Sequence, residues 1–500
     1  MAEYPNNRVS GTTPPAIATA ISFFIFLYVA LRAATLSITI DEAFTYSWHV
    51  TGSWSEIMLF RTPGLPDNNH VLLTLLSKLS VLVFGLSELT LRLPSLLGCL
   101  CYLLGLNLCL RRIVPGWGQV FGLLVVGMNP YVLDFLGLAR GYGLGLGFSM
   151  LGLAALLDAL EEFPGKVQSV PAGTAFILFV LAVLSHLSFL LVLAPVLVII
   201  IATLVYSGTG RRANQAAQKS PWGLLWRIIV TTLLLVGYLS IPLRIIHQRK
   251  LFGEGGHTGF WANTVGSLIE GTIYNTPLLF NQDRLLGLWI IITLLALPFA
   301  LWTMSRSDRK KYMALATIIT ITGIASLGSL IQHVLFNVAW LQGRRGIFLI
   351  PLFLLSALAL GNLTRSSPRW LAALGTLIGV IVPVVLVANG FMSMNLSSTY
   401  DWKNCAGTRE AMLVIRDKIA RGKPDGPLYM RSHWILEYGV NFYRHTMGLE
   451  ASLVNTDGFE EPANLYYGYT DDEKTITGYG ARLLLRQPLS ETVLYESKAP

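Results

Sequence analysis

Long apolar runs separated by short polar segments dominate the first 390 residues of the chain. Most runs contain about 20 residues, the length that an α-helix needs to cross the hydrocarbon core of a bilayer. The first run is longer than the roughly 7–15-residue apolar core of a signal peptide, and no cleavage pattern follows it, so we expect a retained anchor. The pattern predicts eleven transmembrane spans, at 16–38, 91–110, 117–136, 141–160, 172–187, 188–206, 223–246, 284–304, 312–337, 346–363 and 369–391.

One apolar run is left out of this count. The stretch from Val71 to Gly85 carries Lys78 in its middle, and at ~1.5 Å per residue it covers about 22 Å, short of the ~30 Å core. We therefore predict a juxtamembrane helix that lies on the outer surface and extends the first polar segment to 39–90. A short true span is the alternative.

The pattern changes after the last span. Met412, Leu413, Ile415 and Ile419 recur at helical spacing in a segment that stops at Gly422. A short strand at 427–430 and a second helix at 433–446 follow. We expect an all-α polytopic membrane domain at 1–395 and a small α/β extracytoplasmic domain at 396–500.

Composition and charge predict how the bundle is oriented in the membrane. Hydrophobic residues make up 53% of the chain, charged residues 13%, the mean hydropathy is +0.56 and the net charge is +9. The basic excess falls in clusters between apolar runs, such as Arg111-Arg112 and Arg211-Arg212, which is typical of cytoplasmic loops and not of a nucleic-acid surface. The segments 39–90 and 247–283, the turn at 134–142 and the C-terminal tail are then predicted to face outward.

The first candidate residues are Asp41 and Glu42, which come directly after the first apolar run. Acids at the end of a helix are often only solvated, but a carboxylate near membrane depth is costly and favours a functional role. Two adjacent carboxylates on a helix cannot both enter one pocket, so we expect Asp41 to point inward and Glu42 toward the loop.

Asp134 and Arg140 form a second pair of candidates, with Tyr142 beside them. The two charges can neutralise each other across a turn. Alternatively, Arg140 binds an anion such as phosphate, for which a planar guanidinium is suited. Both interpretations are open from the sequence.

Three further candidates lie in predicted outer segments. His70 follows Asn68-Asn69, where a structural or a substrate-contacting role is open. Arg344 and Arg345 lie on the outer side, against the positive-inside pattern, and predict an anionic partner such as a lipid-linked phosphate. Glu88 and Arg92 have the spacing of an ordinary helical ion pair, and we expect a structural role for them.

Four motifs together resemble the GT-C class of integral membrane glycosyltransferases, in particular the bacterial branch similar to protein O-mannosyltransferases and aminoarabinose transferases. They are Asp41-Glu42 at the end of the first span, an outer segment that opens with His70 and continues through Glu88 and Arg92, Asp134 upstream of the Ala-Arg-Gly-Tyr sequence at 139–142, and Arg345 before Pro351. The chain departs from the class after His70 and after Arg345, where Val71 and Gly346 replace the usual residues.

The resemblance implies an inverting transfer of a sugar from a polyprenyl-phosphate donor to a glycan, lipid or protein hydroxyl on the outer face of the membrane. It implies Asp41 as general base, with Asp134 assisting it. Glu42, His70, Arg140, Tyr142, Arg344 and Arg345 are the predicted substrate-binding residues. The class's plan fits a bacterial inner membrane with the active site and the C-terminus facing the periplasm or the outside.

Two further expectations complete this interpretation. Some members of the class use a divalent metal, but this sequence predicts no ligand set, so no metal residue is named. The alternative function is a transporter or flippase of a lipid-linked or polysaccharide substrate, which predicts intramembrane charges or broken helices in corresponding positions of two halves.

Overall fold

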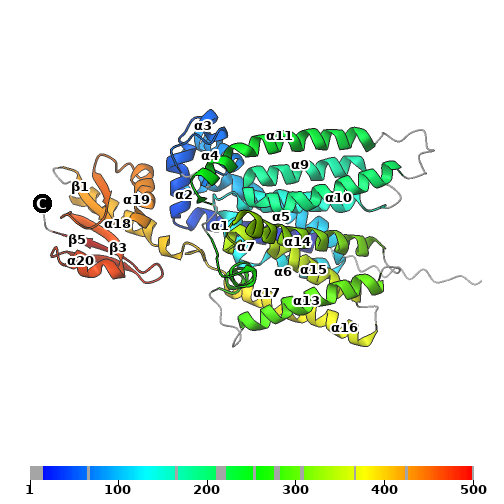
Figure 1. The fold of residues 1–500 in the computed structure, drawn as a ribbon. Coiled ribbons are helices and arrows are strands. Elements are labelled where there is room, and N and C mark those ends of the chain that lie inside the picture. Colours follow the sequence, from blue (N-terminus) through cyan, green and yellow to red (C-terminus); the bar gives the residue numbers. More distant parts are fainter. Residues whose placement is uncertain are drawn as a thin grey trace, which may run out of the picture.

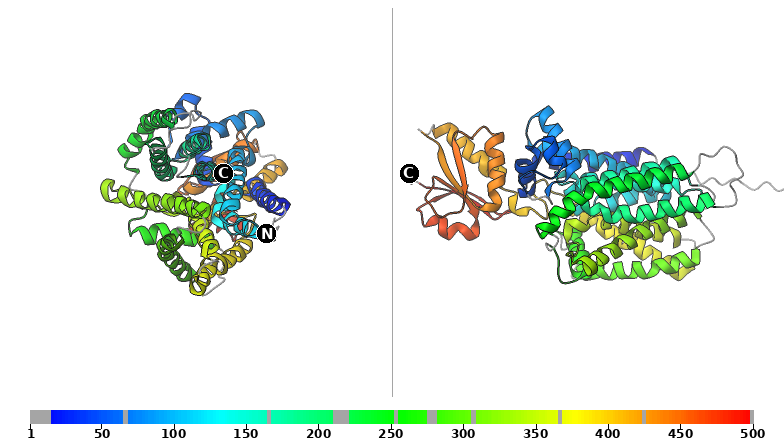
Figure 2. Two further views of the ribbon diagram at one scale, coloured as in Figure 1. Left: turned by 90° about the vertical axis from the view of Figure 1, so that its right-hand side faces the viewer. Right: turned by 45° about the horizontal axis from the view of Figure 1, so that its top comes forward.

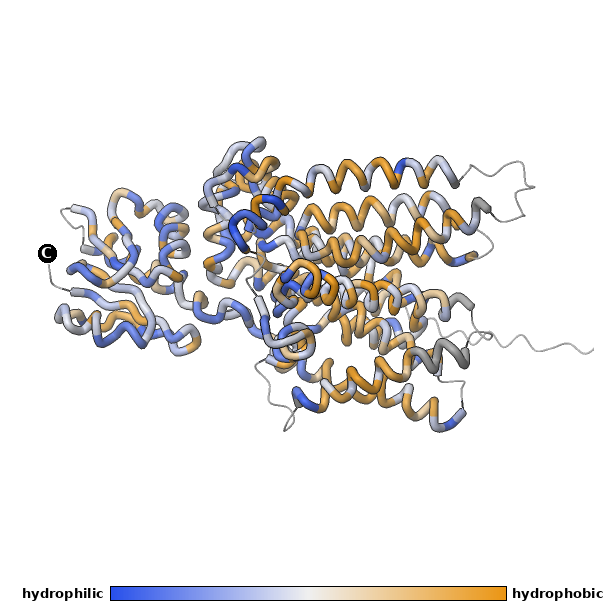
Figure 3. Tube along the Cα trace, in the orientation of Figure 1, coloured by the Kyte–Doolittle hydropathy of each residue, from blue (hydrophilic) through white to orange (hydrophobic). Residues whose placement is uncertain are grey.

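The chain forms a bundle of long helices with a small α/β domain at one end (Figure 1). The computed structural model describes residues 15–64, 68–163, 167–209, 221–251, 255–274, 282–304, 309–364, 368–422 and 426–497. Hydropathy divides the molecule in the same way, because apolar residues fill the helices of the bundle and polar residues increase toward the α/β domain (Figure 3).

The helices of the bundle follow the predicted apolar runs, except for one short helix in the predicted outer segment 247–283. They are α1 (Pro15–Thr35), α5 (Glu88–Ile113), α6 (Trp117–Gly127), α7 (Pro130–Gly137), α8 (Tyr142–Ala159), α9 (Ser169–Ser185), α10 (Leu190–Thr209), α11 (Pro221–Gln248), α12 (Ser267–Ile273), α13 (Gln282–Met304), α14 (Arg309–Phe336), α15 (Leu349–Leu363), α16 (Arg369–Thr376) and α17 (Val382–Met392). Within the described residues, seven helices are long and apolar enough to cross a membrane, or eight if the bent pair α6–α7 counts as one span. This confirms a polytopic helical membrane protein, while the total of eleven crossings stays a prediction.

The predicted span at 117–136 forms two helices instead of one. It is broken between α6 and α7, which are bent by 70° at the break. The sequence at the break explains the bend, because Asn129 caps α7 by accepting the N–H of Val132 at 3.1 Å and Pro130 occupies the first turn. Proline has no N–H to continue α6 and favours the start of a new helix.

The first outer segment contains four short elements: α2 (Ile40–Thr45), a π-helical turn η1 (Tyr46–Val50), α3 (Trp54–Met58) and α4 (Val71–Phe84). They gather at the end of the bundle that carries the α/β domain (Figure 1). Lys78 of α4 turns back onto this segment, where its ammonium donates to the carbonyl of Val50 at 3.0 Å and lies 5.8 Å from the ring of Trp54. A lysine inside the apolar run is therefore accommodated by polar and aromatic groups, and the position of α4 on the membrane surface stays a prediction.

The C-terminal tail forms the predicted α/β domain. Helices α18 (Thr408–Gly422) and α19 (Trp434–Thr446) accompany a five-stranded mixed sheet in the order β2-β1-β3-β5-β4. The strands are β1 (Leu428–Ser432), β2 (Leu453–Asp457), β3 (Leu465–Tyr469), β4 (Arg482–Gln487) and β5 (Thr492–Glu496); β1 is parallel to β2 and β3, and the other pairs are antiparallel.

Helix α19 joins this domain to the bundle. The hydroxyl of Tyr443 donates to Glu88 at 2.9 Å and accepts the N–H of Ile38 at 2.9 Å, at the end of the first helix. Trp48 of the first outer segment donates to the hydroxyl of Tyr438 at 3.4 Å. The domain therefore packs on the segment that holds Asp41 and Glu42, at one end of the bundle (Figure 2).

Candidate functional site

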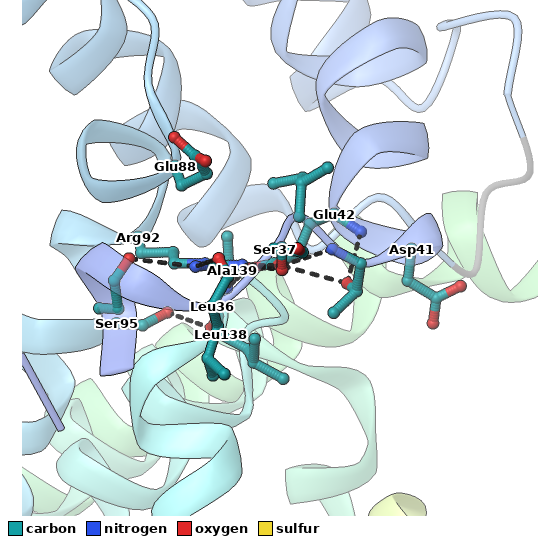
Figure 4. Close-up of polar contacts among 12 residues, drawn as sticks. Leu36, Ser37, Asp41, Glu42, Glu88, Arg92, Ser95, Leu138 and Ala139 are labelled. Atoms are coloured by element: carbon teal, nitrogen blue, oxygen red, sulfur yellow. Dashed lines mark hydrogen bonds and ion pairs between the residues drawn. The ribbon is translucent and has the colours of Figure 1, made fainter. Parts of the chain in front are cut away.

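Asp41 and Glu42 point in opposite directions, as Figure 4 shows. Both begin α2, where Thr39 and Glu42 form a capping box. The Glu42 carboxylate turns into the protein toward Arg92, whereas the Asp41 carboxylate turns away from that cluster. Successive helical residues lie about 100° apart around the axis, so a buried Glu42 directs Asp41 elsewhere.

Arg92 uses all of its hydrogen-bond donors to close the turn between α1 and α2. It donates to both oxygens of Glu42 at 2.8 and 2.7 Å, and to the carbonyls of Ala33, Leu36 and Ser37 at 2.8–3.0 Å. The last carbonyls of a helix have no partner within it. The side chain of Arg92 therefore both hydrogen-bonds the backbone carbonyls at the end of α1 and neutralises the charge of Glu42.

Glu42 is consequently enclosed by protein groups. Its side chain is 0% exposed, and it also accepts the N–H of Ala139 at 2.7 Å. Burial alone would raise the pKa of Glu42, but Arg92 and the Ala139 N–H hold that pKa below its ordinary value. In this geometry Glu42 links the first outer segment to the loop that carries Arg140, and its predicted substrate-binding role stays a prediction. Arg92 does not form the predicted helical pair with Glu88, which binds Tyr443.

Asp41 lies on the wall of a cavity of about 400 Å³. Six of the eight predicted site residues line this cavity, all except Glu42 and Asp134. The polar lining consists of Asp41, Asn68, Asn69, His70, Arg140, Tyr142, His186, Ser188, Tyr238, Gln332, Arg344 and Arg345. Helices α9, α10 and α11 contribute much of the apolar lining. Residues from positions 41 to 345 thus share one wall.

Two guanidinium groups face Asp41. The Oδ2 atom of Asp41 lies 3.2 Å from Nη2 of Arg140 and 3.2 Å from Nη2 of Arg344. Arg140 is buried and also donates to Asn68. The side chain of Asp41 remains 20% exposed, so this carboxylate is paired yet open to the cavity.

Several buried polar atoms of the cavity wall have no hydrogen-bond partner within the described residues. They are Nε2 of His70, Oδ1 of Asn69 and Nε of Arg140. The three side chains are 4–5% exposed. An unsatisfied buried polar atom costs free energy unless water or a ligand meets it. The wall is therefore built to receive a polar molecule.

The imidazole of His70 is held in its neutral form. Burial is the largest influence, followed by the charges of His186 and Arg140, and together they bring the pKa of His70 well below its usual value of 6.5. The His186 ring stacks on Tyr142, with ring centroids 3.9 Å apart. A neutral imidazole can donate or accept a hydrogen bond without adding charge to the cavity.

Asp134 does not line the cavity, and its predicted catalytic role stays a prediction. Its carboxylate is buried and paired with Arg32, and it accepts from the hydroxyl of Tyr274 at 3.0 Å and from the N–H of Tyr400 at 2.8 Å. Arg140 lies instead beside Asp41. The two charges that could have neutralised each other across the turn therefore have separate partners, and Asp134 holds the segment after α17.

Asp401 is a residue of the site that sequence reasoning missed. Its Oδ2 atom accepts from Nη1 of Arg344 at 3.3 Å. An acid flanked by Tyr400 and Trp402, shortly after the last apolar run, is the signal that could have indicated it. The structure also places His186 on the cavity wall.

The side chains around Asp41 do not fit a divalent cation. Within the part of the chain that the structure describes, no group of three or more His, Cys, Asp and Glu side chains is placed to hold a metal ion. Asp41 faces two guanidinium groups, which repel a cation. We derive no step of the chemistry through a metal.

No family model matches the sequence, and no curated protein matches it. Two solved structures have a similar course of the chain. One is ArnT from Cupriavidus metallidurans bound to undecaprenyl phosphate, with 15% identity and a TM-score of 0.48 over 96% of this chain and 97% of that chain. The other is the archaeal oligosaccharyltransferase AglB from Archaeoglobus fulgidus in complex with an inhibitory peptide and a dolichol-phosphate, with 12% identity and a TM-score of 0.45 over 97% and 75%.

Proposed function

We propose that the protein transfers a sugar from a polyprenyl-phosphate donor to a hydroxyl group of a glycan, lipid or protein acceptor. The observation that supports this most directly is the open carboxylate of Asp41, between Arg140 and Arg344 on the wall of a cavity with unsatisfied polar atoms. The GT-C resemblance of the sequence names the reaction class, and the cavity supplies the groups that this reaction needs.

The charge of the cavity suits a phosphate. Arg140, Arg344 and Arg345 line it together with one carboxylate, Asp41. Guanidinium groups bind phosphate through paired hydrogen bonds and retain their charge at every physiological pH. Leu190 and Leu191 of α10, with Leu239 and Leu243 of α11, offer apolar surface beside these charges for the first isoprene units of the donor.

Transfer then follows a single displacement. The acceptor oxygen attacks C1 of the sugar, the bond between C1 and the phosphate oxygen breaks, and the hydroxyl proton passes to Asp41. Polyprenyl phosphate leaves with the bonding electron pair, and the arginines stabilise the charge that develops on it. Attack from the side opposite the leaving group inverts the configuration at C1.

The neutral wall residues serve the sugar itself. Nε2 of His70 and Oδ1 of Asn69 are buried and available to sugar hydroxyl groups. Hydrogen bonds to such groups give strong selectivity, because a substrate that lacks the hydroxyl leaves a buried polar atom unpaired. We propose these two residues as substrate contacts.

We place the cavity on the outer face of the membrane. Arg112 pairs with Asp158 near the end of α8, and α8 begins with Tyr142 at the cavity. The cluster Arg111-Arg112 therefore marks the opposite end of the bundle, and such clusters favour the cytoplasm. The other cluster, Arg211-Arg212, lies outside the described residues.

The test is transfer by purified protein with radiolabelled pentose, hexose and aminosugar polyprenyl phosphates. We expect Asp41→Asn to lower the turnover of the active donor roughly 100- to 10,000-fold, the usual contribution of a positioned base. Asp158→Asn is the matched control, because it removes the same charge about 24 Å away along α8 and is expected to retain wild-type turnover.

Full transfer by the Asp41→Asn variant would refute the base assignment. Absence of transfer by the wild type with every donor would refute the proposed function and favour transport. The bent pair α6–α7 is the observation that supports transport, because broken helices are typical of transporters. Movement of a fluorescent polyprenyl phosphate across proteoliposomes would then identify that activity.

A further inference from the structure

The segment between α17 and α18 contacts Arg344, one of the arginines that line the cavity. After α17 ends at Met392, the chain runs through residues 393–402 before α18 begins. This connector carries Asp401, whose carboxylate contacts Arg344 but does not line the cavity. Arg344 is the described hydrogen-bond partner of Asp401 that lines the cavity.

A buried ion pair fixes the connector. Arg32 of α1 donates to the carbonyls of Asn395 and Ser398 at 2.7 and 2.8 Å. Its partner Asp134 accepts the N–H of Tyr400 at 2.8 Å, next to Asp401. Arg32 and Asp134 are each 2% exposed. The position of Asp401 is thus set by three charge-assisted contacts to the preceding backbone.

Arg344 is shared between two carboxylates. Its Nη2 atom lies 3.2 Å from Asp41, and its Nη1 atom lies 3.3 Å from Asp401. The ring of Trp402 lies against the same guanidinium, with 4.9 Å from its central carbon to the ring centroid. Tyr131, at the start of α7, donates to both oxygens of Asp401 at 3.3 Å. Every described contact of Asp401 therefore serves to hold it against Arg344.

We propose that Asp401 is a positioning residue that divides the charge of Arg344 between itself and Asp41, and so limits how tightly the cavity holds an anionic donor. This inference rests on the proposed function for the identity of the anion. Asp401 weakens the attraction of Arg344 for a phosphate, which aids release of the polyprenyl phosphate product. It also prevents Arg344 from pairing with Asp41 alone, and so keeps the Asp41 carboxylate open to the acceptor hydroxyl.

The proposal predicts an effect of opposite sign to that of a merely structural anchor. Without the charge of Asp401, the cavity becomes more positive and an anion binds more tightly. Arg344 then pairs more strongly with Asp41, so proton transfer to Asp41 becomes slower. If Asp401 only anchored the connector, its loss would loosen Arg344 and weaken anion binding.

The experiment compares the full-length wild type with Asp401→Asn, using undecaprenyl phosphate as the probe. We expect the dissociation constant of the probe to fall roughly two- to fivefold, the usual range for a partly exposed ion pair. In the transfer assay, KM for the donor and kcat are both expected to fall. Asp401→Glu keeps the charge and is expected to restore both values, and Asp158→Asn again controls for net charge.

A double substitution tests the route of the effect. In an Arg344→Gln background, Asp401→Asn is expected to leave probe affinity unchanged, because the residue through which it acts is absent. An equal effect in both backgrounds would overturn the proposal. So would weaker or unchanged probe binding by the folded Asp401→Asn protein.

If Asp401→Asn does not fold, Tyr131→Phe provides a second test. It removes one hydroxyl and leaves Asp401 bonded to Arg344 alone, so probe binding is expected to weaken; unchanged binding would count against the proposal. Probe binding is measured without turnover. A wild type that transfers no sugar would therefore refute the proposed function while the affinity changes still decide the role of Asp401.

Discussion

Asp41 and Glu42 are neighbours in the chain and carry the same charge, yet the fold gives them opposite environments. Glu42 is sealed: it is 0% exposed, and its oxygens are met by Arg92, Thr39 and Ala139. Asp41 is 20% exposed, pairs with two arginines and remains open to the cavity. The difference teaches that exposure to the cavity, and not the number of partners, distinguishes Asp41, the proposed base, from Glu42.

The buried carboxylate of Glu42 also determines the position of Asp41. By accepting the N–H of Ala139, Glu42 fixes the loop in which the next residue, Arg140, faces Asp41. By pairing with Arg92, it fixes the turn from α1 into α2. The structural carboxylate therefore sets the position of Asp41 and of one of its two cations.

The largest expected effect on stability comes from a substitution of the buried acid, Glu42. Glu42→Gln leaves Arg92 as an unpaired buried charge, so we expect the free energy of unfolding to fall by about 3–5 kcal/mol. The measurement is thermal unfolding of the purified protein in detergent, followed by circular dichroism. Transfer activity is expected to fall with the folded fraction, in contrast to Asp41→Asn.

Glu56→Gln is a matched control for that variant. Glu56 closes a second capping box with Ser53 in the same outer segment, but its side chain is exposed and it has no described arginine partner. Glutamine can still accept the N-cap N–H in a capping box, so we expect only slight destabilisation, much less than for Glu42→Gln. Equal destabilisation by both substitutions would show that the Glu42–Arg92 ion pair has no special weight.

An intermediate effect, on donor binding, is expected from Arg140→Lys, which changes a partner of the exposed acid Asp41. Lysine keeps the charge but not the planar fork that meets Asp41 and Asn68 together. We expect KM for the donor to rise roughly tenfold, because a hydrogen bond to a charged group contributes about 1.5 kcal/mol or more. An unchanged KM, with folding intact, would remove Arg140 from the donor site.

The smallest expected effect is the pH dependence of stability that arises from the neutral imidazole of His70. The pKa of His70 is lowered in the folded protein, so below about pH 6.5 the unfolded chain binds a proton that the folded protein does not. His70 thus stabilises the fold less as the pH falls, by up to roughly 1.4 kcal/mol per unit below pH 6.5. We expect His70→Gln to lose less stability than the wild type between pH 7 and pH 5.5, measured by thermal unfolding; parallel curves would contradict a neutral His70.

Local patterns in the sequence predict most of the architecture. Apolar runs indicate the long helices, and the spacing of Met412, Leu413, Ile415 and Ile419 indicates α18. The Asn129-Pro130 pair could have indicated the bend between α6 and α7, because both residues favour a helix start. A periodicity count over the apolar run hides this break.

The partners of the charged residues could not be predicted in the same way. Asp134 and Arg140 are six residues apart, but Asp134 binds Arg32, and Arg140 binds Asp41. Each pairing depends on how distant helices pack, which spacing along one segment does not report. Six predicted site residues nevertheless line one cavity, because the sequence motifs all lie at the same end of the predicted spans.

The wide spacing of these partners along the chain has a consequence for biosynthesis. Arg92 follows Glu42 by fifty residues, so the turn that directs Asp41 can close while the chain is still being made. Arg344 emerges only after α14, and Asp401 only after α17, the last helix of the bundle. An unfinished chain therefore holds its acid and one of its arginines but not the complete anion site, and the cavity acquires its full charge only in the last stage of synthesis.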